Sequence, residues 1–546
     1  MVTPEVAPPE REAPPAGAAA QPPTARPATE PSGPGRASRY SRPLREQARI
    51  ARRLGLTGSL LMAISALGSG AFPVPNPLNG LRVLGLPGRN VTASIAVTYA
   101  GLGMVVLAWL WIGRMLTARG AVAPAPEKRE LVRTGLLWAI PLALAPPMFT
   151  KDIYSYLAQS ATLARGIDPY VIGPAQALGI ADPLVSGIPT VWRDTPAPYG
   201  PLFLGLGRVI TAISGENAVL GVLEHRALAL LGLGLIVWML PKLARRAGLD
   251  PGLVLWLGAA NPLVLFHLVS GIHNESLMIG LMLVGLHLAL GEDDTVQPPW
   301  RWLLGAVFIV SAASVKLPAL LALGFVGVYL IRRRGGSVRD WAVVGGALTA
   351  VAAVVFTIYS VGTGLGFNWL KGLSAPGAIR SWMSVSTDLG LLAGQIGKVA
   401  GLGDHTDSTL SLTRLLGGIA FSLVCLWLLY GCLRGKVEPI VGVGAGLGAV
   451  VLLGPVVHPW YLLWAVIPLT ATRAMPHYRR AVLGLSAVLA LVVPPTGADF
   501  IFRAFQLPLA IIAGIVVFVV ALLWVRRELR KPVRGADPAP SLESAP

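Results

Sequence analysis

The residue best suited to chemistry is an acidic side chain, Asp152, which directly follows an apolar stretch ending near Phe149. A carboxylate at a membrane surface is costly unless water, a cation or a substrate partners it. Such a group can take the proton of a sugar hydroxyl while a new bond forms, which makes Asp152 our candidate general base. An ordinary interfacial ion pair with the neighbouring Lys151 is the alternative interpretation.

Other side chains that could assist this reaction recur beside later apolar stretches. Cations stabilise a leaving phosphate, and the candidates for that role are Lys316, Arg193 and His458. The candidates for contacting sugar rings and hydroxyl groups are Tyr154, Tyr156, Trp192, Asp194, Tyr199, His273, Asn274, Glu275 and Trp460. Together these residues predict group transfer from a lipid phosphate.

These residues also have ordinary explanations. Lys316 could extend its ammonium group to the membrane surface, and the aromatic residues could form an interfacial belt. Asp152, Asp194 and Glu275 could hold a divalent metal, but assistance by Lys and Arg side chains needs none. The sequence therefore predicts no cofactor firmly, and the two cysteines give no metal or redox signal.

The composition indicates a protein embedded in lipid. Of its 546 residues, 54% are hydrophobic and 13% are charged, whereas soluble domains carry about 25% charged residues. The net charge of +18 comes from short basic runs between apolar stretches, as expected for loops on the cytoplasmic side of a membrane. The sequence therefore argues against nucleic acid as a partner.

The apolar stretches predict an all-α polytopic membrane protein with about fourteen transmembrane helices and external juxtamembrane helices. With the basic runs placed inside, both termini are cytoplasmic, and the candidate polar residues fall on the external side. The long external segments are 151–217 and 361–408, and the apolar piece 199–213 is interpreted as a helix at the membrane surface. The predicted spans are 54–72, 91–113, 133–150, 218–240, 252–270, 276–290, 302–315, 317–331, 337–360, 409–432, 437–456, 460–473, 480–496 and 505–526.

The chain divides into three predicted regions. Residues 1–53 are rich in Pro and Arg and form a disordered cytoplasmic tail, because they could not build a core. Residues 54–526 form the transmembrane catalytic domain. Residues 527–546 form a second cytoplasmic tail.

Several short motifs resemble those of a known group. In chain order they are 152–156, 166–170, 192–201, 261–263, 273–275, 315–318 and 458–461. They are similar to motifs of the actinobacterial polyprenyl-phosphomannose-dependent α-1,6-mannosyltransferases, which belong to the GT-C glycosyltransferases. The resemblance covers roughly residues 50–525, and the order of the motifs is more specific than any single motif.

This resemblance implies a GT-C-like fold and an enzyme of the plasma membrane with an extracytoplasmic active site. It implies inverting transfer of mannose from polyprenyl-phosphate-mannose to a lipid-linked α-1,6-mannan acceptor in lipomannan and lipoarabinomannan assembly. The family's catalytic Asp corresponds to Asp152. The family's motif has an Asp at the third position of a His-Asn-Asp turn, where this chain has Glu275, which keeps the charge but lengthens the side chain.

Two alternatives remain open at this stage. The residues themselves do not select mannose, because arabinofuranosyl or glucosyl transfer would need the same phosphate and base chemistry. A lipid or sugar transporter would place its polar residues near the membrane midplane, often within inverted repeats. The sequence shows no internal repeat, so transport is the weaker hypothesis.

Overall fold

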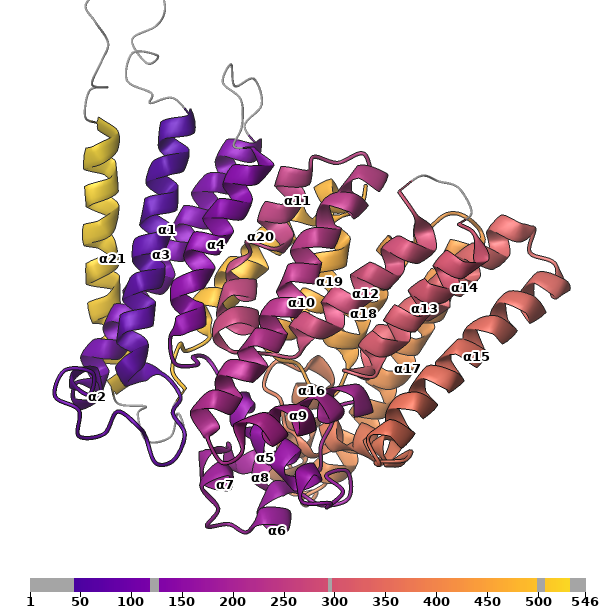
Figure 1. Cartoon of the computed structure of the whole chain (residues 1–546), viewed down its shortest axis with the longest axis horizontal. Coiled ribbons are helices and arrows are strands. Elements are labelled where there is room, and N and C mark those ends of the chain that lie inside the picture. The colour runs from indigo at the N-terminus through magenta and orange to yellow at the C-terminus, as the bar shows by residue number, and fades with distance from the viewer. Residues whose placement is uncertain (1–43, 118–126, 293–296, 498–505, 531–546) are drawn as a thin grey trace, which may run out of the picture. The chain divides into compact units, whose positions relative to one another are not determined.

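A computed structural model describes residues 44–117, 127–292, 297–497 and 506–530, which form helices joined by turns with no strand among them (Figure 1). The fold is therefore all-α and polytopic, as predicted. Six helices are individually long and apolar enough to cross a membrane. They are α1 (Leu44–Ser69), α3 (Val91–Thr117), α10 (Ala218–Arg246), α15 (Val338–Gly362), α17 (Thr406–Leu433) and α21 (Gln506–Arg530).

The other predicted spans coincide with shorter or broken helices. The π-helix η2 (Val264–Ser270) and α12 (Glu275–Leu290) form a pair bent by 108° that passes the same test together. The remaining shorter helices are α4 (Lys128–Leu144), α11 (Pro251–Gly258), α13 (Pro299–Ala313), α14 (Leu321–Arg334), α18 (Pro439–Leu453), α19 (Leu462–Thr470) and α20 (Met475–Val492). The number of fourteen crossings thus stays a prediction. Each predicted span overlaps a helix, and the spans 252–270, 317–331 and 460–473 each cover two consecutive helices.

The long segment after α4 folds into a group of short helices that lie together at one end of the long ones (Figure 1). Its last helix is the apolar piece that was predicted to be a surface helix. The helices of this segment are α5 (Asp152–Ala164), α6 (Pro174–Leu178), α7 (Pro183–Gly187), α8 (Thr190–Arg193) and α9 (Pro201–Ser214). Elsewhere the shorter elements are α2 (Leu86–Arg89), the 3-10 helices η3 (Leu317–Leu320), η4 (Asn368–Ala378) and η5 (Pro459–Tyr461), and α16 (Val385–Val399).

The ends of the predicted domain differ slightly from the prediction. Residues 44–53 were predicted to belong to the disordered tail, but they form the start of α1, which begins at Leu44. Ala48 and Ala51 in this stretch are buried. An alternation of arginines with small apolar residues allows one face of this helix to pack while the other stays polar. The rest of the predicted tails, apart from 527–530 in α21, lies outside the described residues.

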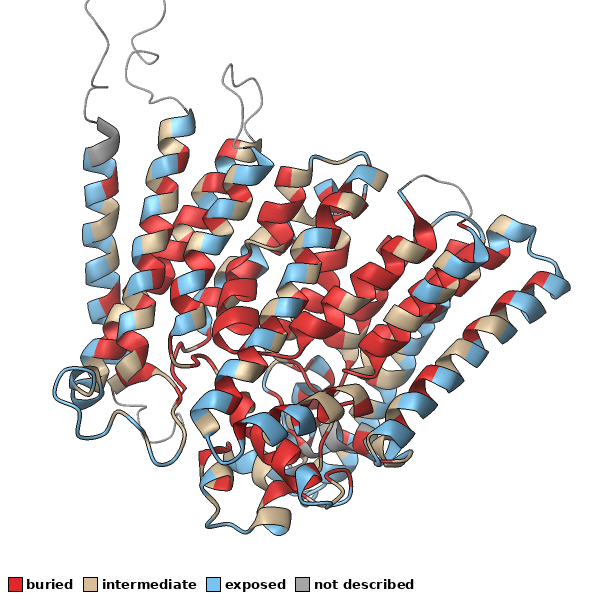
Figure 2. Ribbon diagram, in the orientation of Figure 1, coloured by how far each residue is buried: buried red, intermediate tan, exposed pale blue. Residues whose placement is uncertain are grey.

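Burial separates the interior of the protein from the surface that faces lipid. Buried residues line the facing sides of the helices, while α15 and α21 expose most of their length (Figure 2). Leu415 and Leu423 of α17 are each 61% exposed, and Val520 of α21 is equally exposed. Apolar surface of this extent would be a liability in water and is expected of helices solvated by lipid.

The basic turns gather at one end of the helices. Arg245 forms a 3.2 Å ion pair with Glu292, which joins the α10–α11 turn to the end of α12. Arg473, after α19, donates to the carbonyl of Ala247. Helices α4 and α10 run in opposite directions, so the segment that follows α4 lies at the end of the bundle away from the basic α10–α11 turn. The topology predicted from the basic runs requires this arrangement.

Candidate active site

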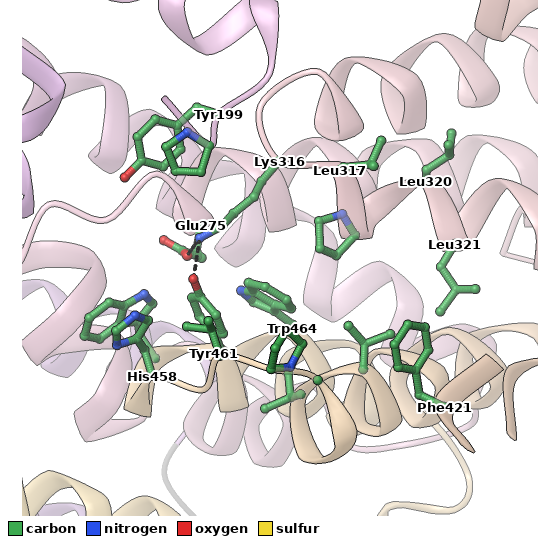
Figure 3. Close-up of a pocket in the computed structure, with 18 of the residues that line it drawn as sticks. Tyr199, Glu275, Lys316, Leu317, Leu320, Leu321, Phe421, His458, Tyr461 and Trp464 are labelled. Atoms are coloured by element: carbon green, nitrogen blue, oxygen red, sulfur yellow. Dashed lines mark hydrogen bonds and ion pairs between the residues drawn. The ribbon is translucent and has the colours of Figure 1, made fainter. Parts of the chain in front are cut away.

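A cavity of about 840 Å³ brings together residues from distant parts of the chain (Figure 3). It lies between the α5–α9 segment and the ends of several long helices. The predicted site residues that line it are Asp152, Tyr156, Trp192, Tyr199, His273, Glu275, Lys316, His458 and Trp460. One end of the cavity is thus polar, and it contains the predicted base and two of the three predicted phosphate ligands.

Breaks between helices position this polar end. Asp152 and Glu275 are the first residues of α5 and α12, while Lys316 and His458 immediately precede η3 and η5. The N-terminus of a helix carries a partial positive charge, so converging N-termini favour an anionic ligand. This arrangement suits a phosphate better than the single ammonium group of Lys316 would alone.

Asp152 lies at the end of a strained turn. Phe149 has a φ of 70°, which is unusual for a residue with a side chain and costs free energy that the surrounding packing must supply. The backbone N–H of Asp152 donates to the Thr150 hydroxyl at 3.0 Å, and its carboxylate is hydrogen-bonded by Trp192. Burial is the largest influence on this carboxyl group and raises its pKa to about 6.

Lys316 and Glu275 form an ion pair inside the cavity (Figure 3). The ammonium group also donates to the Tyr461 hydroxyl at 3.2 Å and lies 4.4 Å from the centre of the Tyr461 ring and 5.3 Å from that of Trp464. An ammonium group has three N–H donors, and two are used by Glu275 and Tyr461. One donor direction therefore remains for a ligand.

A close backbone contact holds Lys316 at this place. The N–H of Gly200 donates to the carbonyl of Val315 at 3.0 Å, and a Cβ atom at Gly200 would lie only 2.2 Å from the carbonyl oxygen of Ser314. Only glycine allows this approach, which locks the start of α9 onto the junction between α13 and η3. Tyr199 and Lys316 consequently face the same cavity.

His273 connects the two carboxylates. Its Nδ1 atom lies 3.7 Å from Asp152 and 3.9 Å from Glu275, and its ring stacks on Trp460 with centroids 3.8 Å apart. The preceding residue, Ile272, has a φ of 58°, so this turn is strained in the same way as the turn before Asp152. Two strained turns that bring neighbouring polar side chains to one cavity are typical of a functional site.

The other end of the cavity is apolar and leads toward the lipid-facing surface. It lies between α14, α17 and α18, and its walls include Leu320, Leu321 and Val450. Phe421 and Ser422 of α17 line both this arm and a shallow depression on the outer face of that helix. The cavity therefore combines a site for an anion with a path suited to a hydrocarbon chain.

Comparison with known proteins gives the family. Residues 52–332 match the α-(1→6)-mannopyranosyltransferase N-terminal domain, and residues 386–523 match the MptB C-terminal domain. The chain is 44% identical to a probable α-(1→6)-mannopyranosyltransferase of Mycolicibacterium smegmatis, with 90% of this chain and 91% of that protein covered. It is 42% identical to an α-(1→6)-mannopyranosyltransferase of Mycobacterium tuberculosis, with 90% of each chain covered.

A third relative is α-(1→6)-mannopyranosyltransferase B of Corynebacterium glutamicum, which is 37% identical over 82% of this chain and 77% of its own length. The chain belongs to the α-(1→6)-mannopyranosyltransferase family. The resemblance noted from the sequence motifs is thus confirmed. In this member of the family, the cavity places Asp152 and Lys316 at one polar end.

Four of the predicted site residues do not line the cavity. Tyr154 points away and donates to the carbonyl of Ala71 at 3.1 Å, and Asn274 is buried between two residues that do line it. Arg193 donates to the carbonyls of Ser186 and Ile188 at 3.1 Å each, so its guanidinium group holds a loop together. Asp194 is exposed at the end of α8. This placement does not support phosphate binding by Arg193.

The sequence reasoning missed two residues of the site. Tyr461 and Trp464 hold the ammonium group of Lys316 and line the cavity. Their spacing of three residues places them on one face of a helix, which was a usable signal. Within the described part of the chain, no cluster of three or more His, Cys, Asp or Glu side chains could hold a metal ion.

Proposed function

We propose that this chain is an inverting mannosyltransferase that moves mannose from a polyprenyl phosphate to an α-1,6-mannan acceptor. The proposal rests chiefly on one observation, the cavity that joins Asp152 and Lys316 to an apolar arm. The names of its relatives supply mannose and the α-1,6 linkage. The lipid donor and a place in lipomannan and lipoarabinomannan assembly follow from the motif resemblance and fit the apolar arm.

The polar end can support each part of such a transfer. A hydroxyl group of the acceptor attacks the anomeric carbon, and the bond from that carbon to the phosphate oxygen breaks with its electron pair on the phosphate. Asp152 accepts the hydroxyl proton. The remaining N–H of Lys316 and the converging helix N-termini stabilise the charge of the departing phosphate. Attack from the side opposite the phosphate inverts the anomeric centre.

The apolar arm fits the prenyl chain of the donor. With the phosphate at Lys316, the chain would run past Leu320 and Leu321 toward Phe421 and leave between α14 and α17. The basic turns lie at the other end of the helices, which supports an extracytoplasmic site under the positive-inside rule. The donor could then enter sideways from the bilayer.

The direct test is mannose transfer from labelled polyprenyl-phosphomannose to a short α-1,6-mannoside, with purified full-length protein. Asp152→Asn should abolish transfer and keep donor binding. Gly324→Leu should fill the apolar arm, because a Cβ atom there meets only Leu429 at 3.7 Å, and should raise the KM for the donor at least tenfold. Gly345→Leu on α15, where a Cβ atom meets nothing within 4 Å, is the matched control.

Three results would overturn parts of the proposal. Full activity of folded Asp152→Asn protein would remove Asp152 as the base. Wild-type protein that does not transfer mannose, but transfers arabinofuranose or glucose from the corresponding polyprenyl-phosphate donor, would keep the site and change the sugar. An unchanged donor KM in Gly324→Leu would remove the prenyl chain from the arm.

A further inference from the structure

A second cavity, of about 350 Å³, lies between α4 and α10. Both helices pack on α11 and η2, which form the floor between them, and Arg226 of α10 donates to the carbonyl of Ala143 of α4 at 2.8 Å. All the residues that line this groove are apolar or glycine. Leu136 and Ile140 on its rim are 57% and 53% exposed, so the groove opens to the surface that faces lipid.

Two glycine residues leave the groove open. Gly135 of α4 and Gly234 of α10 both line the groove, and a Cβ atom at either position would meet nothing within 4 Å. By contrast, a Cβ atom at Gly232 on the same α10 helix would lie 2.4 Å from the backbone of Leu277. Gly232 thus serves helix packing, whereas Gly135 and Gly234 leave space that protein does not fill.

One end of the groove is basic. A second hollow, which shares Val132 and Leu136 with the groove, is lined by Lys128, Arg129 and Arg133 of α4. Within the described residues, no ion pair joins these three side chains to a carboxylate. The nearest acids in sequence are Glu127 and Glu130, and Glu130 interacts with Arg52 of α1.

The facing helix continues the same pattern. One turn beyond Gly234 on α10, Trp238 is 56% exposed, and the ammonium group of Lys242 lies 4.5 Å from its ring centre. Tryptophan and lysine in this order are typical of the boundary between hydrocarbon and headgroups. The basic end of the groove therefore lies at headgroup level, on the side of the bundle that carries the basic turns.

The length of the groove matches one leaflet. Leu131 and Ala143 mark its two ends on α4, and the 12 helical steps from one to the other correspond to about 18 Å of helix. Half of a hydrocarbon core is about 15 Å thick. An acyl chain that starts at headgroup level would thus fill the groove and end at the membrane midplane.

We propose that this groove is a binding site for an anionic phospholipid, with one acyl chain between α4 and α10 and the phosphate on Arg129 and Arg133. This site is separate from the candidate active site and does not depend on the proposed function. Charge complementarity selects a lipid over another apolar helix, because a helix would not need three cations at the mouth. The bound chain would support α4, whose far end leads into the strained turn before Asp152.

The test measures lipids that remain bound to purified full-length protein. The protein is incubated in detergent with equal amounts of phosphatidylglycerol and phosphatidylcholine, and bound lipid is counted by native mass spectrometry. Wild type should retain the anionic lipid at least fivefold over the zwitterionic one. Combined Gly135→Leu and Gly234→Leu substitutions should lower total retained lipid, and combined Arg129→Gln and Arg133→Gln substitutions should remove the preference for the anionic lipid.

Matched controls separate this site from ordinary lipid contact. Gly345→Leu adds the same side chain at another open glycine, on α15, and Arg339→Gln removes an exposed charge from the start of that helix. Both should behave as wild type. Equal lipid retention by the groove-filled and control variants would overturn the proposal. A wild-type dimer that the groove-filling substitutions dissociate would also overturn it, because a second copy of the chain would then occupy the groove.

Discussion

The dependence of mannose transfer on pH should report the Asp152 carboxyl group. Burial raises its pKa from 3.8 to about 6, and the charge of Glu275 adds to this increase. Hydrogen bonds from Thr150 and Trp192 and the charge of Lys316 act in the opposite direction. A base must be ionised, so at pH 5 only about a tenth of the protein should be active, compared with more than about nine-tenths for an ordinary Asp.

The same pKa shift predicts an effect on stability. The folded protein binds the Asp152 proton more tightly than the unfolded chain does, so ionisation opposes folding. The difference between 3.8 and about 6 corresponds to about 3 kcal/mol. This destabilisation is absent below about pH 4, grows between about pH 4 and 6, and is complete above that range. Asp152→Asn should therefore stabilise the folded protein by up to about 3 kcal/mol at pH 7.5.

The assay combines rates and unfolding. Initial rates are measured from pH 4.5 to 8 with the donor well below its KM, and thermal unfolding of wild type and Asp152→Asn is followed in detergent at pH 7.5 and 4.5. The wild-type rate should fall tenfold per pH unit below about pH 6. The stability gain of the variant should shrink at pH 4.5.

A surface carboxyl group provides the control. Hydrogen bonds from Thr406 and Lys398 hold the pKa of Asp404 below its ordinary value. Asp404→Asn should therefore leave the acid limb unchanged and should not stabilise the protein at pH 7.5. An acid limb centred near pH 4, or an Asp152→Asn protein that melts below wild type at pH 7.5, would refute the reasoning.

Three further substitutions test the surroundings of Asp152. Lys316→Gln or Glu275→Gln alone leaves an uncompensated buried charge and should destabilise the protein by about 3–5 kcal/mol in thermal or denaturant unfolding. The double variant should recover part of this stability but not the activity. A double variant less stable than both single variants would contradict this account of the pair. Arg193→Gln should cost about 1–3 kcal/mol by freeing the carbonyls of Ser186 and Ile188. Hydrogen exchange in that loop should rise while the donor KM stays constant, and a tenfold higher KM with an unchanged loop would restore a phosphate-binding role.

Local geometry explains why only some of the candidate residues share the cavity. On α5, Asp152 and Tyr156 are four residues apart and face the same side, while Tyr154 lies between them and points to the opposite side. On the short helix α8, the adjacent Trp192 and Arg193 point in different directions for the same reason. The 3.6-residue period of these helices predicts that such neighbouring side chains face different sides. Their residue types alone do not.

The sequence by itself determined the all-α membrane fold, because lipid demands apolar helices and each apolar run marks one. It also located the polar residues at the breaks between those runs. Only the tertiary structure decided which breaks converge: Glu275 meets Lys316 across 41 residues, and Phe421 completes the wall of their cavity. Hydrophobic periodicity is a local property of the chain, whereas the pairing of distant breaks depends on how whole helices pack, which no single segment encodes.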